Sequence, residues 1–404
     1  MHSFTALFLL ETTLSALISF RSIRRLPVLV VFTVLLLYAG EARAQVLAKY
    51  GGDFLAGGVG ARALGMGGTA VGLVQDVTAG YWNVAGLSGL DVPEVAYMHA
   101  ERFSGVVSFD YGGAAFPISS RSTVGLSVFR VGVDDIPNTL NAWDRERNQP
   151  LPNAENYVTR FSAADYAFFL SYARMASEQL SFGVTGKIIR RGIGDFAEAW
   201  GYSFDVGAQY RTRSVVLGVQ LQDASTMLQS WSINEDAFAI EGINPDTGEP
   251  FTFQETFGQA LPEGGSYLVL PVMRLGSGLV VPMGESALTL GLDMDVAFDG
   301  QRAYAFNAGD ISFHPRFGTE FSYKGVLALR AGLDQISTSE VDGFNATPSV
   351  GAGLNFKQLS VDYGFGDFSG LVSELGYSHR ISVQFRLSGE NWQRAQPSQE
   401  EAQP

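Results

Sequence analysis

The sequence predicts an all-β protein, a transmembrane antiparallel β-barrel of about fourteen strands with a Gly-rich N-terminal plug. Three observations predict it. A segment typical of an export signal opens the chain. After that segment no apolar run is long enough for a spanning helix, although the mean hydropathy is +0.10. Many segments of about 9–12 residues alternate between apolar and polar side chains, as strands do between lipid and a polar lumen.

The export signal has the three parts that a signal peptide needs. An apolar stretch of 13 residues, 26–38, follows Arg21, Arg24 and Arg25, and a small-x-small sequence ends at Ala44. Thirteen residues are too few for a spanning helix, which needs roughly 20. We therefore expect residues 1–44 to be a signal peptide that is cleaved near Ala44, and the mature chain to lie in the outer membrane of a Gram-negative bacterium.

Composition excludes several classes of function. The chain has no cysteine, which rules out thiol catalysis, disulfide frameworks and cysteine zinc sites. Its formal net charge is −14, and this argues against nucleic-acid binding, which needs a basic surface. The 47 Gly, 29 Phe and 15 Tyr suit short turns and the aromatic belts of a membrane barrel.

The alternation is clearest in residues 287–299, 358–366 and 379–387. A soluble barrel or sandwich would also alternate, with the apolar face as its core. The export signal and the length of the strands favour the membrane version. We expect strands at about 92–100, 105–116, 121–131, 164–173, 180–191, 199–211, 214–223, 265–276, 284–298, 314–324, 325–334, 347–356, 358–365 and 375–387.

Fourteen is an even number, as a closed antiparallel barrel with both ends on one side requires. The two long connections, 132–163 and 224–264, are the third and the seventh, so both fall on the same rim. Long loops of such barrels face outward and short turns face the periplasm. The predicted organisation is a plug in residues 45–90, a barrel in 91–388 and a disordered polar tail in 389–404.

The predicted plug resembles a known family. The stretch Gly60-Ala-Arg-Ala-Leu-Gly-Met-Gly-Gly-Thr, then Asp76, then Tyr81-Trp-Asn-Val-Ala-Gly-Leu87 is similar to the N-terminal signature of PorV/PorQ-type proteins, which belong with the FadL-like outer-membrane barrels. Residues 375–385 are similar to that family's closing strand. One departure is Val84, where the family usually has Pro. The resemblance implies that the plug is carried by Gly60, Arg62, Gly65, Gly67, Gly68, Asp76, Trp82, Asn83 and Gly86.

The resemblance also implies a choice of functions. The first is a non-enzymatic component of type IX-like secretion or of surface assembly, whose partners are secreted cargo proteins or other secretion components. The second is FadL-like transport of hydrophobic small molecules, with a hydrophobic ligand. The third is a structural barrel. All three place the chain in contact with outer-membrane lipid.

No pattern in the sequence predicts catalysis, a cofactor or a metal. The stretch Gly58-Val-Gly60-Ala-Arg-Ala63 fits G-x-G-x-x-A, but no βαβ unit surrounds it, so close packing in a plug explains the glycines better. The mature chain has only His99, His314 and His379, at no metal-binding spacing. We therefore expect no enzyme activity.

Two further groups of residues are candidates for a site. Asp293 and Asp295 lie two apart, on one strand face, and with Arg380 and Arg386 they are expected to face the lumen. They form either a solvated wall or a cation or permeation site. Lys187, Arg190 and Arg330 are possible partners across the lumen.

The aromatic residues of the long connections are predicted to contact a partner or ligand: Trp143, Trp231, Phe251 and Phe253. The alternative is a lid that packs only on itself. The acidic residues of 224–264 leave calcium binding open, although no ordered ligand pattern appears. A loop of that length without regular structure is usually functional or disordered, and its aromatics argue against disorder.

Overall fold

The computed structural model describes residues 46–47, 53–102, 105–144, 147, 149–238, 248–249, 251–254, 260, 264–298, 306–339, 343–366 and 378–387. The predicted signal peptide 1–44 with its cleavage site at Ala44, and the predicted tail 389–404, lie outside these residues. Parts of 224–264 do as well.

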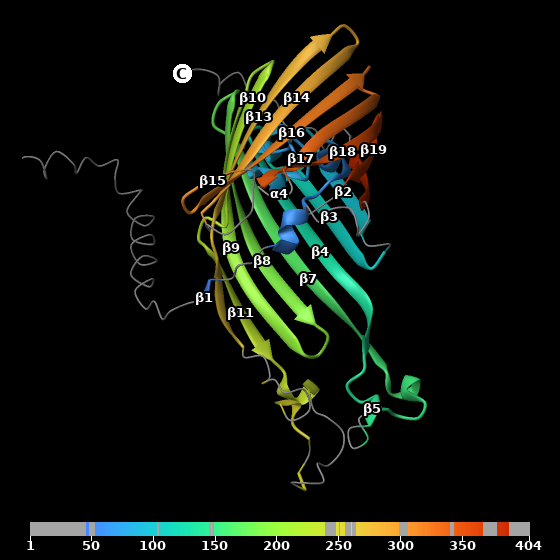
Figure 1. Ribbon diagram of the computed structural model, residues 1–404. Coiled ribbons are helices and arrows are strands. Elements are labelled where there is room, and N and C mark those ends of the chain that lie inside the picture. Colours follow the sequence, from blue (N-terminus) through green and yellow to red (C-terminus); the bar gives the residue numbers. More distant parts are fainter. Residues whose placement is uncertain are drawn as a thin grey trace, which may run out of the picture. The chain divides into compact units, whose positions relative to one another are not determined.

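The described residues form a closed antiparallel barrel of fourteen wall strands, which confirms the predicted fold class (Figure 1). The first and last wall strands pair with each other, from Glu94↔Arg386 to Glu101↔His379, and this closes the barrel. In order the wall consists of β2 (Glu94–Arg102), β3 (Val107–Pro117), β4 (Ser122–Asn138), β7 (Thr159–Met175), β8 (Leu180–Ile193), β9 (Ala197–Arg211), β10 with β11 (Val215–Gln222, Met227–Ile233), β12 with β13 (Gly265–Val269, Val272–Met283), β14 (Ser286–Ala297), β16 (Ile311–Tyr323), β17 (Leu327–Ser339), β18 (Gly343–Phe356), β19 (Leu359–Gly366) and β20 (Ser378–Arg386).

Two neighbouring wall strands are interrupted at the same level. Between β10 and β11 the chain makes a turn in which Asp223 and Thr226 have φ of 54° and 59°. Both β10 and β11 pair with β9, so together they act as one strand with a large bulge. On the next strand Pro271, which has no N–H to donate, separates β12 from β13.

The bulge corrects one expectation. Residues 224–264 were predicted to be a loop without regular structure, but the wall continues there as β11, and η4 (Glu235–Phe238) follows it. Trp231, predicted as a loop contact, therefore lies on a wall strand. The prediction failed because positive φ at two non-glycine residues cannot be read from the sequence, so the strand was taken to end at the bulge.

Several strands on one side are longer than expected. β4 and β7 have 17 residues each and continue, together with β8, β9 and β11, toward the short hairpin of β5 (Trp143–Asp144) and β6 (Gln149–Pro150) (Figure 1). η3 (Ala154–Tyr157) lies in the same connection. The connection predicted as 132–163 is correspondingly shorter, 139–158. The remaining short strands are β1 (Val46–Leu47) and β15 (Phe306–Ala308), which pairs with the start of β16.

The walls alternate as the sequence predicts. On β14, Leu290 and Leu292 are exposed on the outside while Asp293 is completely buried inside. Large apolar side chains cover the outer surface of most strands, from Phe168 on β7 to Phe385 on β20. No helix among the described residues is both long and apolar enough to span a membrane.

The segment before β2 folds into a hatch, which we define as residues 53–90. It consists of η1 (Asp53–Gly57), α3 (Ala61–Gly65), α4 (Ala79–Trp82) and η2 (Val84–Gly89), and it lies within the ring of strands (Figure 1). Most of its side chains are buried, including polar Thr69 and Asn83. Four short helical turns joined by glycine-rich bends make a compact body rather than a further strand.

The hatch packs backbone to backbone against a row of inward-facing glycines on the wall. A Cβ on Gly351 would lie 3.0 Å from the Cα of Gly65, and a Cβ on Gly364 would lie 2.7 Å from the carbonyl oxygen of Ala61. Nine consecutive wall strands, β8 to β10, β13, β14 and β16 to β19, each contribute a glycine on which a Cβ would lie within 3.0 Å of a hatch atom, a side-chain atom at Gly207 and Gly291: Gly183, Gly207, Gly218, Gly276, Gly291, Gly318, Gly332, Gly351 and Gly364.

Candidate functional site

The hatch is tied to the barrel by polar side chains of the inner wall. Arg380 on β20 is completely buried, and its guanidinium donates hydrogen bonds to the carbonyl oxygens of Gly57, Gly58 and Gly60 at 2.8, 3.0 and 3.3 Å. These carbonyls precede α3, and that of Gly60 also accepts from the N–H of Leu64 at 3.2 Å. The last strand of the barrel thereby fixes the entry of the hatch into the lumen.

Asp293 on β14 holds the middle of the hatch. One of its carboxylate oxygens accepts hydrogen bonds from the backbone N–H groups of Ala70 and Val71, at 2.7 and 2.8 Å. Two hydroxyls bind the hatch backbone in the same manner, since Gly67 N–H donates to Ser349 and Ala61 N–H donates to Ser382. Charged and polar wall residues here satisfy hatch amides that would otherwise be buried without partners.

A four-membered ion network joins the hatch helix α3 to three wall strands. Arg62 donates to both carboxylate oxygens of Glu320 at 2.9 Å, in the bidentate geometry that favours arginine. Glu320 also accepts from Arg330 at 2.6 Å, and Arg330 donates to Asp362 at 2.7 Å. The negative charge of Glu320 raises the pKa of Arg62 above its ordinary value, against the opposing effect of burial. Arg62 therefore stays charged and paired.

The partners of Asp295 differ from those that the sequence suggested. Asp295 pairs with Arg274 at 3.7 Å and also with Arg316. The guanidinium of Arg274 lies 5.6 Å from the ring centre of Tyr81 and 5.7 Å from that of Trp82, so this pair reaches the hatch through cation–π contacts. Sequence reasoning missed both arginines, although each lies on the same face of its strand as the neighbouring inward residues.

The suggested cationic partners lie elsewhere. Lys187 is buried between Asp205 and Asp223, with Nζ at 2.8 Å from the first. Arg190 was wrongly placed in the lumen, because it lies on the outer face of β8 beside Trp200, with half of its side chain exposed. Arg386 is on the same face of β20 as Arg380, at the strand end, and pairs with Glu94 at 3.2 Å.

The second part of the hatch motif, Tyr81 to Leu87, is also packed in the interior. Trp82 donates from its indole N–H to the carbonyl of Val59 at 2.9 Å, and Tyr81 donates to the carbonyl of Leu55. Asn83 caps η2 by accepting from Ala85 N–H at 3.3 Å, and its amide donates to two carbonyls, one of them on wall strand β9. These side chains hold the hatch together.

The other motif residues have local roles. Asp76 accepts from the N–H of Thr78 at 2.8 Å, which forms a turn before α4. Gly67 and Gly68 have positive φ of 64° and 75°, and Gly67 packs against the backbone of Leu333. A Cβ on Gly86 would overlap the carbonyl of Val74, so this glycine permits a close approach within the hatch. Val84, where the resembled family has Pro, uses its N–H to donate to Gln220 at 3.2 Å.

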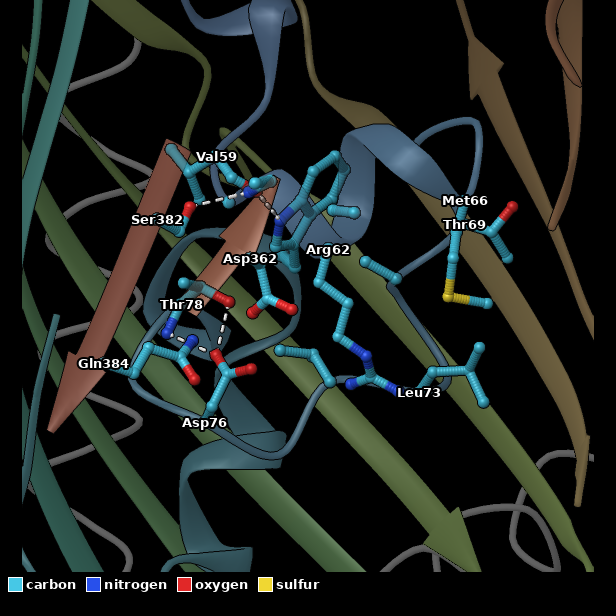
Figure 2. Close-up of a pocket in the computed structure, with 16 residues that line it drawn as sticks. Val59, Arg62, Met66, Thr69, Leu73, Asp76, Thr78, Asp362, Ser382 and Gln384 are labelled. Carbon is cyan, nitrogen blue, oxygen red and sulfur yellow. Dashed lines mark hydrogen bonds between the residues drawn. The ribbon is translucent and has the colours of Figure 1, made fainter. Parts of the chain in front are cut away.

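A small cavity remains between the hatch and strands β19 and β20 (Figure 2). Its volume is about 20 Å³, and polar side chains line one part of it: Arg62, Asp76, Thr78, Asp362, Ser382 and Gln384. A space of this size with several polar partners holds about one water molecule. It is too small for an organic ligand. Among the described residues, no group of three or more His, Asp and Glu is placed to bind a metal ion.

The two halves of the lumen differ in chemistry. The side formed by β13 to β20 carries most of the charges described above, and a second buried group, Lys187 with Asp205 and Asp223, lies on β8, β9 and the turn after β10. The side formed by β2 to β8 carries apolar side chains that meet the hatch: Met98, Phe109, Tyr111, Phe129, Phe169 and Ile189. The ring centres of Phe129 and Phe169 each lie 6.2 Å from that of Tyr81. A membrane barrel normally has a polar interior, so this aromatic half is unusual.

Aromatic side chains continue from this half toward the long connections. Arg191, held by Asp165, lies 5.4 Å from the ring centre of Phe54 in the hatch and 5.4 Å from that of Trp231 on β11. Beyond it the rings of Phe161, Phe196, Phe238 and Phe253 follow one another with centres 5.1, 5.0 and 5.4 Å apart. We call the interior aromatics and these outer rings the aromatic track.

The predicted loop contacts are thus divided. Trp231 and Phe253 belong to the aromatic track. Phe251 is half-buried in the described part of the seventh connection. Trp143 lies on the β5–β6 hairpin, with 44% of its surface exposed. The sequence identified these residues by type but could not show which of them would meet.

Comparison with known proteins finds low-identity likeness only. No family model and no curated protein matches the chain. Among solved structures, the toluene transporter TodX of Pseudomonas putida is 14% identical over 82% of this chain and 99% of that one, with a TM-score of 0.49. A FadL homologue of Pseudomonas aeruginosa is 14% identical over 85% and 100%, with a TM-score of 0.46. The toluene transporter TbuX of Ralstonia pickettii is 11% identical over 83% and 100%, with a TM-score of 0.47. The chain is thus similar to solved FadL-type barrels, and the PorV/PorQ resemblance stays a prediction.

Proposed function

We propose that this protein is an outer-membrane barrel that admits small hydrophobic molecules, of the size and character of monoaromatic hydrocarbons, along the aromatic track to a hatch that stays in place. The observation that carries this proposal is the apolar half of the lumen. A channel for polar solutes has no use for buried aromatic rings, whereas a hydrophobic solute gains from leaving water for them.

The polar half supports the second part of the proposal. Buried ion pairs and backbone hydrogen bonds hold the hatch along β13 to β20, so removing the hatch as a whole would leave many charges without partners. On the aromatic half the contacts are between apolar rings, which can change rotamer at small cost. A solute therefore passes more easily there, by displacing side chains, than by expelling the hatch.

Two of the structural neighbours are a toluene transporter and a monoaromatic hydrocarbon channel. The apolar lining of this lumen independently supports the same class of solute, small hydrophobic molecules. The proposal assigns no catalytic residue and no cofactor to the chain.

A matched pair of variants on β7 tests the proposal. Phe169 faces the lumen and is buried, whereas its neighbour Phe168 faces outward and is 46% exposed. We expect Phe169→Ser to reduce uptake of radiolabelled toluene at least about tenfold in cells that depend on this protein, since one buried ring is worth about 1.5–3 kcal/mol. Phe168→Ser should keep most of the uptake. Equal uptake by both variants at equal folded amounts would contradict the proposal.

A second candidate is the secretion or surface-assembly component implied by the PorV/PorQ resemblance. The observation that favours it is the extension of β4, β7 and the β5–β6 hairpin, which presents exposed Trp143 and Tyr157. It predicts an envelope protein that copurifies with the barrel and is lost when residues 139–158 are replaced by a short turn. A barrel that purifies alone in mild detergent, before and after this change, would remove this candidate.

A further inference from the structure

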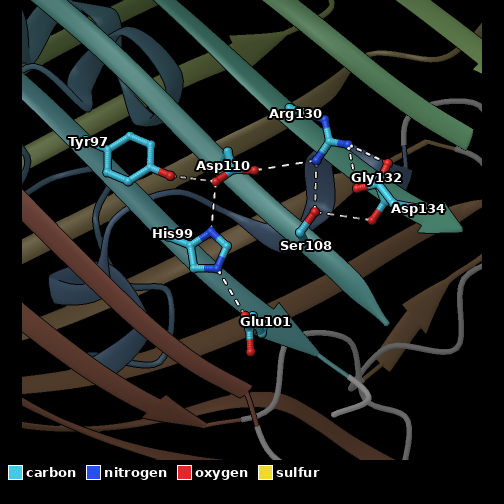
Figure 3. Close-up of polar contacts among 8 residues, drawn as sticks. All are labelled: Tyr97, His99, Glu101, Ser108, Asp110, Arg130, Gly132 and Asp134. Carbon is cyan, nitrogen blue, oxygen red and sulfur yellow. Dashed lines mark hydrogen bonds and ion pairs between the residues drawn. The ribbon is translucent and has the colours of Figure 1, made fainter. Parts of the chain in front are cut away.

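The wall formed by β2, β3 and β4 has reversed polarity near its long-connection end. Met98, Phe109 and Phe129 face the lumen and are buried. Outward-facing side chains of the same three strands are polar here, and we call this group the outer polar cluster (Figure 3): Tyr97, His99, Glu101, Ser108, Asp110, Arg130 and Asp134. Elsewhere on the wall, most outward positions at this distance from the short turns are apolar, and Ser277 on β13 and His379 on β20 are polar exceptions.

The outer polar cluster is a connected network. Asp110 is its centre, and its carboxylate accepts from Tyr97 at 2.8 Å, lies 2.8 Å from Nδ1 of His99 and pairs with Arg130 at 3.6 Å. The other ring nitrogen of His99 lies 3.4 Å from Glu101. Glu101 is 61% exposed and His99 41% exposed in their side chains, so the network is open to the outside of the barrel.

Arg130 extends the network along β4. Its guanidinium donates to Ser108 at 2.9 Å and to Asp134 at 3.2 Å. The cluster contains three carboxylates, one guanidinium and one imidazole, so it makes the outer surface polar on all three strands. Its members bind one another, but their outer edges still require water or polar groups as partners.

The position of the cluster along the strands places it within the apolar belt. On β4 the first polar outward residue is Arg130, eight residues from the short-turn end at Ser122. On β2 the outward residues Tyr97 and His99 are polar, only three and five residues from Glu94. On β14, outward residues stay apolar from Leu288 to Phe298, which is twelve residues beyond Ser286. The apolar belt, which is the run of apolar outward residues counted from the short turns, is therefore several residues shorter on β2 to β4 than on β14.

Hydrocarbon cannot cover this face to the same height. A cationic side chain on the lipid face of a barrel costs about 2–4 kcal/mol at the midplane and about 0–1 kcal/mol near the interface. Each strand residue rises by about 2.5 Å along the axis of a tilted barrel, so a belt shorter by about four residues is lower by roughly 10 Å. If the boundary between hydrocarbon and headgroups is lower by that amount, water and headgroups contact the cluster.

We infer that lipid headgroups of the outer leaflet come down to the outer polar cluster, so that the membrane is locally thinner against β2, β3 and β4 than against β14, β16 and β17. Headgroup phosphates can pair with Arg130. Water and headgroup cations can pair with Glu101 and Asp134, which are 61% and 58% exposed in their side chains. The occupant of this surface is thus the polar layer of the bilayer itself.

Spin labels measure the depth directly, and a chain without cysteine suits single-cysteine labelling. Gly112→Cys lies on the outward face of β3, two residues from Asp110, where a Cβ has ordinary space, 3.9 Å from Val128. Ala331→Cys is the matched control on the outward face of β17. The two positions lie at similar distances from the short-turn ends of their strands, four residues from Leu327 for Ala331 and five residues from Pro117 for Gly112. The full mature chain is folded into dimyristoylphosphatidylcholine vesicles, and oxygen and nickel accessibilities give each label's depth.

We expect the label at Gly112 to lie shallower than the label at Ala331 by about 5–10 Å, from the difference in belt height. Replacing the charged centre, in His99→Leu/Asp110→Leu/Arg130→Leu, should move the Gly112 label deeper. The matched control Lys324→Leu/Glu285→Leu removes an exposed ion pair at a short turn and should change neither depth. Equal depths for the two labels would overturn the inference. So would dipolar broadening of the Gly112 label, because a second copy of the chain would then cover the surface.

Discussion

The close contact between glycine and hatch backbone leads to a quantitative prediction for Gly364→Ala. The new Cβ would lie 2.7 Å from the carbonyl oxygen of Ala61 and 3.3 Å from the side chain of Leu64. The first distance is shorter than real Cβ contacts, and its partner is a backbone atom that cannot rotate away. Helix α3 must therefore move from the wall by several tenths of an ångström, which also stretches its bonds to Ser382 and Glu320.

Overpacking of this kind costs about 1–3 kcal/mol. Because the barrel ladder itself is unchanged, we expect this cost to appear in the local opening of the hatch. Amide hydrogen exchange in peptides covering residues 53–90 should become about 5- to 150-fold faster, since each 1.4 kcal/mol corresponds to a factor of ten. Exchange in the barrel strands far from β19 should stay the same. Mass spectrometry of the protein in detergent micelles measures both.

The control is Gly186→Ala on the outer face of β8, where a Cβ has no neighbour within 4 Å. It replaces the same residue type in a strand but should leave exchange in the hatch within about twofold, because a surface change of this kind is usually worth less than about 0.5 kcal/mol. The reasoning would be refuted if Gly364→Ala protected the hatch as well as the original chain, or if Gly186→Ala accelerated hatch exchange equally.

Other substitutions test the polar anchors of the hatch. Asp293→Ala removes the acceptor of two buried amides, and we expect hatch exchange to rise by about 5- to 150-fold or more, since each unsatisfied buried group costs about 1–3 kcal/mol. Glu320→Gln leaves two arginines with a neutral partner, and a loss of up to about 3–5 kcal/mol should lower the unfolding midpoint in urea measurably. Lys187→Met leaves two buried aspartates without their cationic partner. We expect a similar loss of folding free energy, and the folded band on unheated gels should weaken. Arg380→Met frees three hatch carbonyls, and limited proteolysis should then cut the hatch while the barrel persists.

The fold could be predicted from the sequence because a membrane barrel repeats one simple rule. Strict alternation, as in Leu288 to Phe298, reveals each strand without any knowledge of its neighbours. The parity of the strand count then places the long connections on one rim. Register, by contrast, depends on pairs between strands, so the meeting of Arg274 and Arg316 with Asp295 could not be predicted.

The candidate site was only partly predictable, for two physical reasons. A bulge at Asp223 and Thr226 changes which strand a residue belongs to, and it moved Trp231 from a loop to the wall. The outward direction of Arg190 depends on where the period-2 pattern is anchored, and an error of one residue reverses it. A usable signal was present but not used: glycine recurs at polar-face positions of successive strands, as in Gly291 and Gly364.

The three hydrogen bonds from Arg380 to the hatch have a consequence for assembly. Its three carbonyl partners lie in residues 57–60, ahead of the first wall strand β2, whereas Arg380 lies on the last strand. The hatch, which precedes β2 in the chain, is thus held by the last wall strand to be synthesised. Because β20 also pairs with β2, this one strand both closes the barrel and binds the hatch. Truncation at the C-terminus should therefore leave an open sheet with a loose hatch, an unfinished form that quality-control proteases can distinguish from the completed barrel.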